Sequence, residues 1–321
     1  MIPRKESLYM KYKQWLDTWL TNYVKPIAKR KTFENYSYLI NKHIKGGIGE
    51  LELKKISIHE IQRFIVYLLK EGNIITKKGL SSSTINSIIT IIQSSLKKAY
   101  LIGITKKYNG QEIQRPKMVK KEILSFSIVE QRKIEAAILK EKKEEWLGIL
   151  LCLYTGLRLG ELLSLTWEDV DLQKHMIRVS KTSYYGKNDD GIYQKITYSP
   201  KTTSSYRILP FPKQLISLMK EKKQKYNSIY VVSHNNAPIS LRNYQRIFSH
   251  LLSTLSIEKK GFHSLRHTFA TRALECGMDV KTLSEILGHK NAATTLNLYA
   301  HSFLEHKRKM MDLLGNIMIK V

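Results

Sequence analysis

The chain has 321 residues, which is long for one hydrophobic core and typical of two domains. Hydrophobic residues make up 42% of it, which excludes a disordered polymer. Lys and Arg total 54 against 27 Asp and Glu, so the formal net charge is +27. This excess indicates a polyanionic partner, with nucleic acid first and an anionic membrane second.

The membrane alternative is not supported by the most apolar stretch, residues 146–165. It carries Arg158, Glu161 and three glycines, which a spanning helix would rarely contain. The chain also shows no charged-then-apolar leader at its first residues. We therefore expect no membrane partner, and we interpret 146–165 as a core helix followed by a functional turn.

The two cysteines, Cys152 and Cys276, are too few for a disulfide scaffold or a Cys-type zinc site. A reduced cytoplasm is the simplest location. The Lys-rich and Ile-rich composition suggests an AT-rich bacterial source.

Residues 1–105 predict helices alone. Apolar residues recur at helical spacing over residues 8–20 and 36–44, and the second helix is expected to end at Gly46-Gly47. Ser57 is expected to cap a third helix and Ser83 to open a fourth. Residues 1–122 also carry +15 of the net charge. These patterns predict a Lys-rich, four-helix DNA-binding domain.

Residues 106–123 are rich in Lys, Gly and Asn, which predicts an interdomain linker. After it the pattern mixes helices with short β-branched and aromatic runs. Helices are expected at 128–141, 145–155, 158–166, 240–255, 264–276, 280–287 and 292–299, and strands at 176–180, 193–199, 207–210 and 229–232. The fold class is therefore mainly α with a small antiparallel β-sheet.

Arg158 and Glu161 follow a glycine turn and stand three residues apart, on one face of a predicted helix. A surface ion pair is the ordinary alternative. Further along, His263 and Arg266 also share a helical face. His267 lies four residues after His263, a spacing that also fits a zinc pair, but no clear third ligand is near. We therefore expect no metal, and we interpret His267 as a buried supporting residue.

Three further residues complete the candidate site. Gly288-His289 precedes Tyr299 by ten residues, counted from the histidine. Lys201 lies in the run Pro200–Arg207 between two predicted strands, so it is expected at the tip of a hairpin. Each signal is modest by itself, because a lone tyrosine is usually packing and a Lys-rich turn is common.

In this order the residues resemble the tyrosine recombinase family, which includes phage integrases, Xer-type recombinases and integrases of conjugative transposons. The family carries Arg, Asp or Glu, Lys, His-x-x-Arg, His or Trp, and Tyr. The matching residues are Arg158, Glu161, Lys201, His263, Arg266, His289 and Tyr299. The resemblance implies a helical core-binding domain at 1–105, an α+β catalytic domain at 124–301 and a tail helix for subunit contact at 302–321. Longer relatives carry a further N-terminal arm-binding domain, which we do not expect here.

The resemblance also implies the chemistry, namely a 3′-phosphotyrosine formed by Tyr299 without metal, ATP or another cofactor. Arg158 and Arg266 suit the charge on a phosphodiester because a guanidinium binds phosphate bidentately. His263 and His289 would bond the same phosphate and move a proton, and Glu161 would orient the pocket. The leaving 5′ oxygen needs an acid, and the resemblance assigns this role to Lys201.

The implied partners are double-stranded DNA, three further copies of the chain in a tetramer on two DNA sites, and an accessory DNA-bending protein. Two alternatives stay open. A type IB topoisomerase shares the Tyr, Arg and Lys chemistry but relaxes DNA, and a DNA-binding regulator could have lost catalysis. The Gly-His pair disfavours the first alternative, and the intact residue set disfavours the second.

The tail carries an apolar stripe at helical spacing. Its members are Phe303, Leu304, Met310, Met311, Leu314, Ile317 and Met318. The stripe either packs on its own catalytic domain or, as the resemblance implies, docks on a neighbouring subunit.

Overall fold

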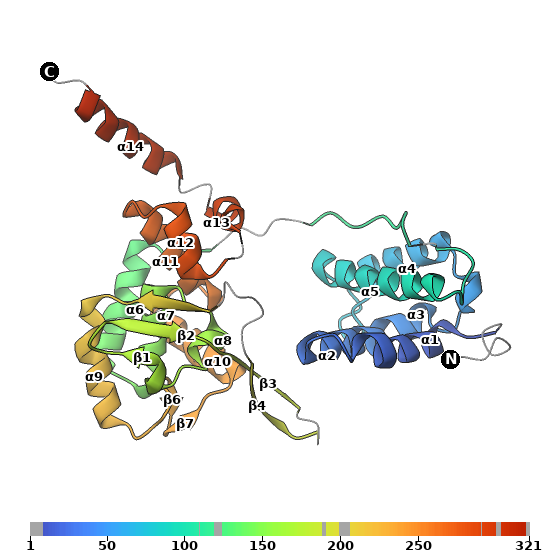
Figure 1. The fold of residues 1–321 in the computed structure, drawn as a ribbon, viewed down its shortest axis with the longest axis horizontal. Coiled ribbons are helices and arrows are strands. Elements are labelled where there is room, and N and C mark those ends of the chain that lie inside the picture. The colour runs from blue at the N-terminus through green and yellow to red at the C-terminus, as the bar shows by residue number, and fades with distance from the viewer. Residues whose placement is uncertain are drawn as a thin grey trace. The chain divides into compact units, whose positions relative to one another are not determined.

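The computed structural model describes residues 9–108, 110–118, 124–187, 191–198, 206–289, 291–299 and 303–318. The chain divides into two compact units, Met1–Lys121 (unit 1) and Glu122–Val321 (unit 2). Helices dominate both, and the strands of unit 2 pair antiparallel. The predicted fold class, mainly α with small antiparallel sheets, is confirmed (Figure 1).

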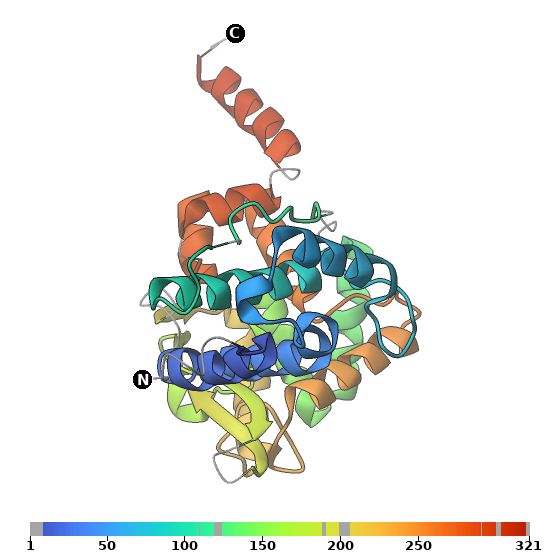
Figure 2. The same ribbon diagram turned by 90° about the vertical axis from the view of Figure 1, so that its right-hand side faces the viewer.

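In its described part, unit 1 has helices and no strand. Its elements are α1 (Tyr12–Trp19), η1 (Leu20–Val24), α2 (Arg30–Leu39), η2 (Ile40–Ile44), α3 (Lys45–Ile48), η3 (Leu53–Lys55), α4 (Ile58–Glu71) and α5 (Ser82–Leu101). The helices α4 and α5 lie side by side in both views (Figures 1 and 2). The side chains of α1 tie to α5, where Trp15 Nε1 donates to the Ser95 carbonyl at 3.0 Å and Tyr12 bonds the Ser95 hydroxyl at 2.7 Å.

Local capping explains where α4 and α5 begin. Ser57 and Glu60 form a capping box, in which the Ser57 hydroxyl accepts from Glu60 N at 3.2 Å and the Glu60 carboxylate accepts from Ser57 N at 3.0 Å. The expected cap at Ser57 is therefore confirmed. The fourth helix begins at Ser82 with Ser81 as its cap, slightly before the predicted start.

The helical backbone continues through Gly46-Gly47, so the prediction that this pair ends the second helix was wrong. A Cβ at Gly47 would lie 2.1 Å from the Phe64 ring of α4. Glycine at this position therefore permits close packing of α3 on α4 and does not act as a stop.

Residues that follow α5 pack back on unit 1. Gln93 donates to the Gly110 carbonyl at 2.7 Å, and Arg115 donates to the Gln93 side chain at 2.7 Å. Ile113 is buried in the same core as the helices. Part of the segment expected as a linker thus contacts α5.

The described residues of unit 2 combine helices with three small sheets. Its helices are α6 (Ile128–Glu141), η4 (Glu144–Trp146), α7 (Leu147–Thr155), α8 (Leu159–Leu162), η5 (Trp167–Asp169), η7 (Lys213–Leu215), α9 (Ile216–Lys225), α10 (Leu241–Thr254), α11 (His263–Glu275), α12 (Val280–Leu287), α13 (Ala292–Tyr299) and α14 (Phe303–Met318). Its strands are β1 (Val170–Asp171), β2 (Met176–Val179), β3 (Thr182–Lys187), β4 (Tyr193–Tyr198), β5 (Arg207–Pro210), β6 (Ser233–His234) and β7 (Ala237–Pro238).

The strand pairing differs from the predicted single sheet. Strand β2 pairs with β1 and β5, while β4 pairs with β3 in a separate ribbon that projects from the domain (Figure 1). The two strands that flank Lys201 therefore do not form a hairpin with each other. Residues 229–232 were also predicted as a strand, but Tyr230 makes only an isolated bridge to Thr166.

The core of unit 2 centres on α7, which is buried along nearly its whole length and packs against α11. Gly156 ends α7 in the left-handed region, with φ at +65°. The helix that follows, α8, spans only Leu159–Leu162, so the prediction of a helix over 158–166 was too long. This short turn carries Arg158 and Glu161 to the site.

In the part of the chain that the structure describes, no helix is both long and apolar enough to span a membrane.

Candidate active site

Arg158 and Glu161 are joined by the local geometry of α8. Arg158 is the N-cap residue, and its backbone N–H donates to Glu161 Oε2 at 2.9 Å. The Arg158 guanidinium also donates to Glu161 Oε1 at 2.8 Å. The Arg158 side chain is 36% exposed and that of Glu161 only 6%. Arg158 therefore remains accessible to a ligand, while Glu161 serves as its buried anchor.

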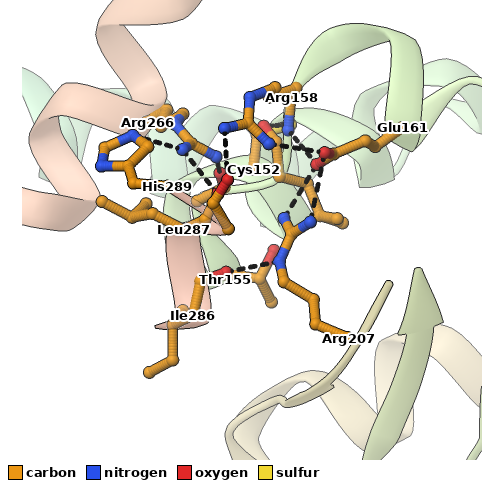
Figure 3. Close-up of polar contacts among 12 residues, drawn as sticks. Cys152, Thr155, Arg158, Glu161, Arg207, Arg266, Ile286, Leu287 and His289 are labelled. Carbon is orange, nitrogen blue, oxygen red and sulfur yellow. Dashed lines mark hydrogen bonds and ion pairs between the residues drawn. The ribbon is translucent and has the colours of Figure 1, made fainter. Parts of the chain in front are cut away.

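Glu161 lies between Arg158 and a third residue, Arg207 of β5 (Figure 3). The Arg207 guanidinium donates to both carboxylate oxygens, at 3.2 and 2.9 Å. Burial would raise the pKa of Glu161, but hydrogen bonding and charge from Arg207 and the charge of Arg158 lower it to about 2. The carboxylate is therefore ionised at neutral pH.

Arg266 of α11 is almost fully buried. Its guanidinium donates to the carbonyls of Gly156 and Leu287, both at 2.7 Å, and lies 2.8 Å from His289 Nε2. Arg266 therefore connects the end of α7, the end of α12 and His289 (Figure 3).

The protonation of His289 follows from its neighbours. Arg266 can only donate, so His289 Nε2 must accept, and Nδ1 carries the proton that is donated to Thr295 Oγ1 at 2.8 Å. Burial, followed by the charges of Arg266 and Arg158, lowers the pKa of His289 to about 4. His289 is therefore neutral at pH 7, with its ring fixed at both nitrogens.

His263 and His267 lie one turn apart on α11, with ring centroids 4.6 Å apart and nearly perpendicular planes. His263 keeps solvent-exposed surface, but its ring is partly desolvated by the packing around it. This desolvation, followed by the charges of Arg266 and Arg158, lowers the pKa of His263. Burial and the neighbouring His263 lower the pKa of His267 to about 4. Among the residues that the structure describes, no group of three His, Cys, Asp or Glu side chains could hold a metal ion.

Two of the predicted site residues, Lys201 and Tyr299, have no described side chain. Lys201 lies in 199–205, outside the described residues. Tyr299 is the last residue of α13, for which the backbone alone is described. Helix α13 packs against α12, and the bond from His289 to Thr295 anchors its first half. Tyr299 thus follows Thr295 by about one helical turn.

Sequence reasoning missed Arg207 and Thr295. Arg207 starts a predicted strand of apolar residues, and its position suggested nothing about a buried carboxylate 46 residues away. Thr295 gave no signal, because a threonine in a predicted helix is common.

Two family models match the chain, one over each unit. The model of the phage integrase family matches residues 121–306, and that of the phage integrase N-terminal SAM-like domain matches residues 11–69. The chain is 30% identical to a XerC-like tyrosine recombinase from Caldanaerobacter subterraneus subsp. tengcongensis, over 95% of this chain and 82% of that protein.

Two solved structures share the fold. The Tn1549 transposon integrase, in complex with a circular intermediate DNA, superimposes with a TM-score of 0.78 at 21% identity, covering 95% of this chain and 99% of that one. The lambda integrase, in a tetramer bound to a Holliday junction, gives a TM-score of 0.67 at 20% identity, covering 90% of this chain and 78% of that one.

The family match and the identity to the XerC-like recombinase show a site-specific recombinase of the tyrosine class, an enzyme that breaks and rejoins DNA strands. The chain belongs to the phage integrase family.

Proposed function

We propose that Tyr299 is the nucleophile and that Arg158, Arg266, His263, His289 and Lys201 assist it. One observation supports the proposal. Arg158 and Arg266 both bond to the turn after α12, and Arg266 also contacts His289 of that turn. In the sequence, this turn comes just before α13, the helix that ends at Tyr299. These residues are far apart in the sequence, and their types match the needs of phosphoryl transfer.

In the proposed step, the Tyr299 oxygen attacks phosphorus and forms a 3′-phosphotyrosine, while the bond to the 5′ oxygen breaks. Lys201 donates the proton that the leaving 5′ oxygen takes up. His263 has a lowered pKa, so it is neutral and can accept the phenol proton. The phosphotyrosine conserves the energy of the broken phosphodiester bond. A 5′ hydroxyl from another strand can therefore reverse the step without ATP.

Arg158 and Arg266 would neutralise the non-bridging phosphate oxygens in different ways. The Arg158 side chain is 36% exposed, so it would meet an incoming phosphate first. Arg266 is buried and held by two carbonyls, so it acts as a fixed charge behind the phosphate.

The proposed partner is double-stranded DNA, which the net charge of +27 favours. The lambda integrase tetramer on a Holliday junction supports a homotetramer on two DNA sites as the working assembly. We further propose that residues 1–105 form a DNA-binding domain, that an accessory DNA-bending protein is a further partner, and that the protein acts at the bacterial nucleoid.

The test is a nicked suicide duplex analysed on a denaturing gel. Wild type should form a covalent adduct, also in excess EDTA, because no metal takes part. Y299F removes the single nucleophilic oxygen, so it should bind DNA and form no adduct. An adduct with Y299F would show that Tyr299 is not the nucleophile. Loss of cleavage in EDTA that zinc restores would instead support the His263–His267 metal pair.

The adduct assay separates the recombinase from a binding regulator, and relaxation of a supercoiled plasmid separates it from a topoisomerase. A binding regulator without catalysis would form no adduct with any variant. A topoisomerase would relax supercoiled DNA without site preference.

A further inference from the structure

The end of α12 presents three consecutive carbonyls, and each accepts a hydrogen bond from a different arginine. Figure 3 labels two of the three acceptors, Ile286 and Leu287. The three pairs are Arg207 Nε to Ile286 O at 2.6 Å, Arg266 to Leu287 O at 2.7 Å, and Arg158 to Gly288 O at 3.0 Å. The last carbonyls of a helix have no partner within the helix and carry partial negative charge, which suits guanidinium donors. We call residues 286–288 the carbonyl turn.

Two of these arginines already have proposed roles at the phosphate, but Arg207 does not. Its side chain is 7% exposed, and it comes from β5, an element that contributes no residue to the proposed set. The Arg207 guanidinium also donates hydrogen bonds to both carboxylate oxygens of Glu161. A buried arginine with five donors suits this double task, because its planar fork can bind a carboxylate and a carbonyl at once.

These contacts close a ring around the site. Arg207 joins the carbonyl turn to Glu161, Glu161 joins Arg207 to Arg158, and Arg158 returns to the carbonyl turn at Gly288. The Arg158 guanidinium therefore has two anchors, and Arg207 holds both of them. Without Arg207, the buried Glu161 would keep only Arg158 as its cationic partner in this ring.

We propose that Arg207 is a positioning residue for strand cleavage, which holds Glu161 and the carbonyl turn so that Arg158 is oriented toward the scissile phosphate. This inference rests on the proposed role of Arg158. It predicts that Arg207 affects catalysis only through Arg158, so the effects of changing the two residues do not add.

The experiment is a double-mutant cycle on the single-turnover rate of adduct formation, with a nicked suicide duplex and saturating protein. R207K is the main variant, because lysine keeps the charge beside Glu161 but cannot bond both carboxylate oxygens and the Ile286 carbonyl together. R207Q removes the charge as well. The matched control is R178Q, which removes an arginine from the neighbouring strand, where Arg178 is 64% exposed and lies 3.7 Å from Asp169.

R207K should slow cleavage about tenfold with a thermal unfolding midpoint near that of wild type, and R207Q should slow it more. R178Q should cleave at the wild-type rate. In the R158A background, adding R207K should change the rate less than about twofold.

Two outcomes would overturn the inference. If R207K slows cleavage equally in the wild-type and R158A backgrounds, Arg207 acts independently of Arg158. If R207K cleaves at the wild-type rate, no positioning role exists. If R158A itself forms the adduct at the wild-type rate, the proposed role of Arg158 is wrong, and so is the inference that Arg207 acts through it.

Discussion

Arg158 and Arg207 bind the same buried carboxylate, that of Glu161, from two sides, at closest distances of 2.8 and 2.9 Å. A buried carboxylate that is bonded to two cations is fixed in one position, and it therefore also fixes the positions of the two cationic side chains. The accessible Arg158 thus has a defined direction before any DNA arrives. This matters for catalysis because a charge that is already oriented needs no reorganisation when the transition state forms.

Arg158 and Arg266 should respond differently to replacement by alanine. R158A should slow cleavage by about a hundred- to a thousandfold, with little change in stability, since Arg158 is partly exposed. R266A should slow cleavage by a similar factor. It should also lower the free energy of unfolding by at least about 2 kcal/mol, because it leaves two buried carbonyls without their arginine donor. Single-turnover cleavage and urea unfolding measure the two effects. An R266A variant as stable as wild type would contradict the fixed-charge role.

Lys201 is tested by the leaving group. K201A should cleave a normal duplex poorly, but should recover on a duplex whose 5′ oxygen is replaced by sulfur, because a thiolate leaves without an acid. The matched control is K195A. Lys195 lies on β4, donates to the Leu163 carbonyl at 2.7 Å and sits 3.8 Å from the Tyr230 ring centre. Recovery of K195A, but not K201A, on the sulfur duplex would assign the acid to Lys195.

His289 should make stability depend on mildly acidic pH. Burial and Arg266 lower its pKa from 6.5 to about 4, so between these values the unfolded state binds a proton that the folded state does not. The contribution of His289 to the free energy of unfolding should therefore be fully present above pH 6.5 and should fall as the pH drops toward 4. His267 should contribute in the same direction, since its pKa is also about 4.

The measurement for His289 is urea unfolding across pH 4 to 7. H289Q should show a shallower fall than wild type, and H250Q, which replaces an exposed histidine of α10, should match wild type. Equal slopes in all three proteins would mean that folding does not lower the pKa of His289.

The tail helix α14 should act in assembly. Its described apolar side chains Met310, Met311, Leu313, Leu314 and Met318 are exposed in the single chain. Deleting 303–321 should leave binding to one DNA site nearly unchanged but abolish the four-subunit complex and strand exchange. Native gels and light scattering on DNA measure both properties.

Substitutions within α14 give a finer version of the same test. M311S/M318S should reproduce the deletion, because these are the two most exposed apolar side chains described in α14. D312N, on the same helix, should assemble normally. A deleted protein that still builds the four-subunit complex would support packing of the tail on its own domain.

The sequence by itself determined the features that depend on near neighbours. Helices α6, α7 and α10 to α13 agree with the predicted ranges because apolar periodicity and caps act within a few residues. The capping box at Ser57 is of this kind. The chemical residue set could also be proposed from the sequence, because its types and order resemble a known family.

Only the tertiary structure decided which distant residues meet. Strand β4 pairs with β3 and not with β5, since strand partners are chosen by packing and not by local propensity. Gly47 permits a helix contact in place of ending a helix, because Phe64 of α4 lies against it. Arg207 reaches Glu161 across 46 residues, and Arg266 reaches the Gly156 carbonyl across 110. Burial of an unpaired ion is costly, so a buried charge must have a partner that is close in the folded structure. No local pattern in the sequence identifies that partner.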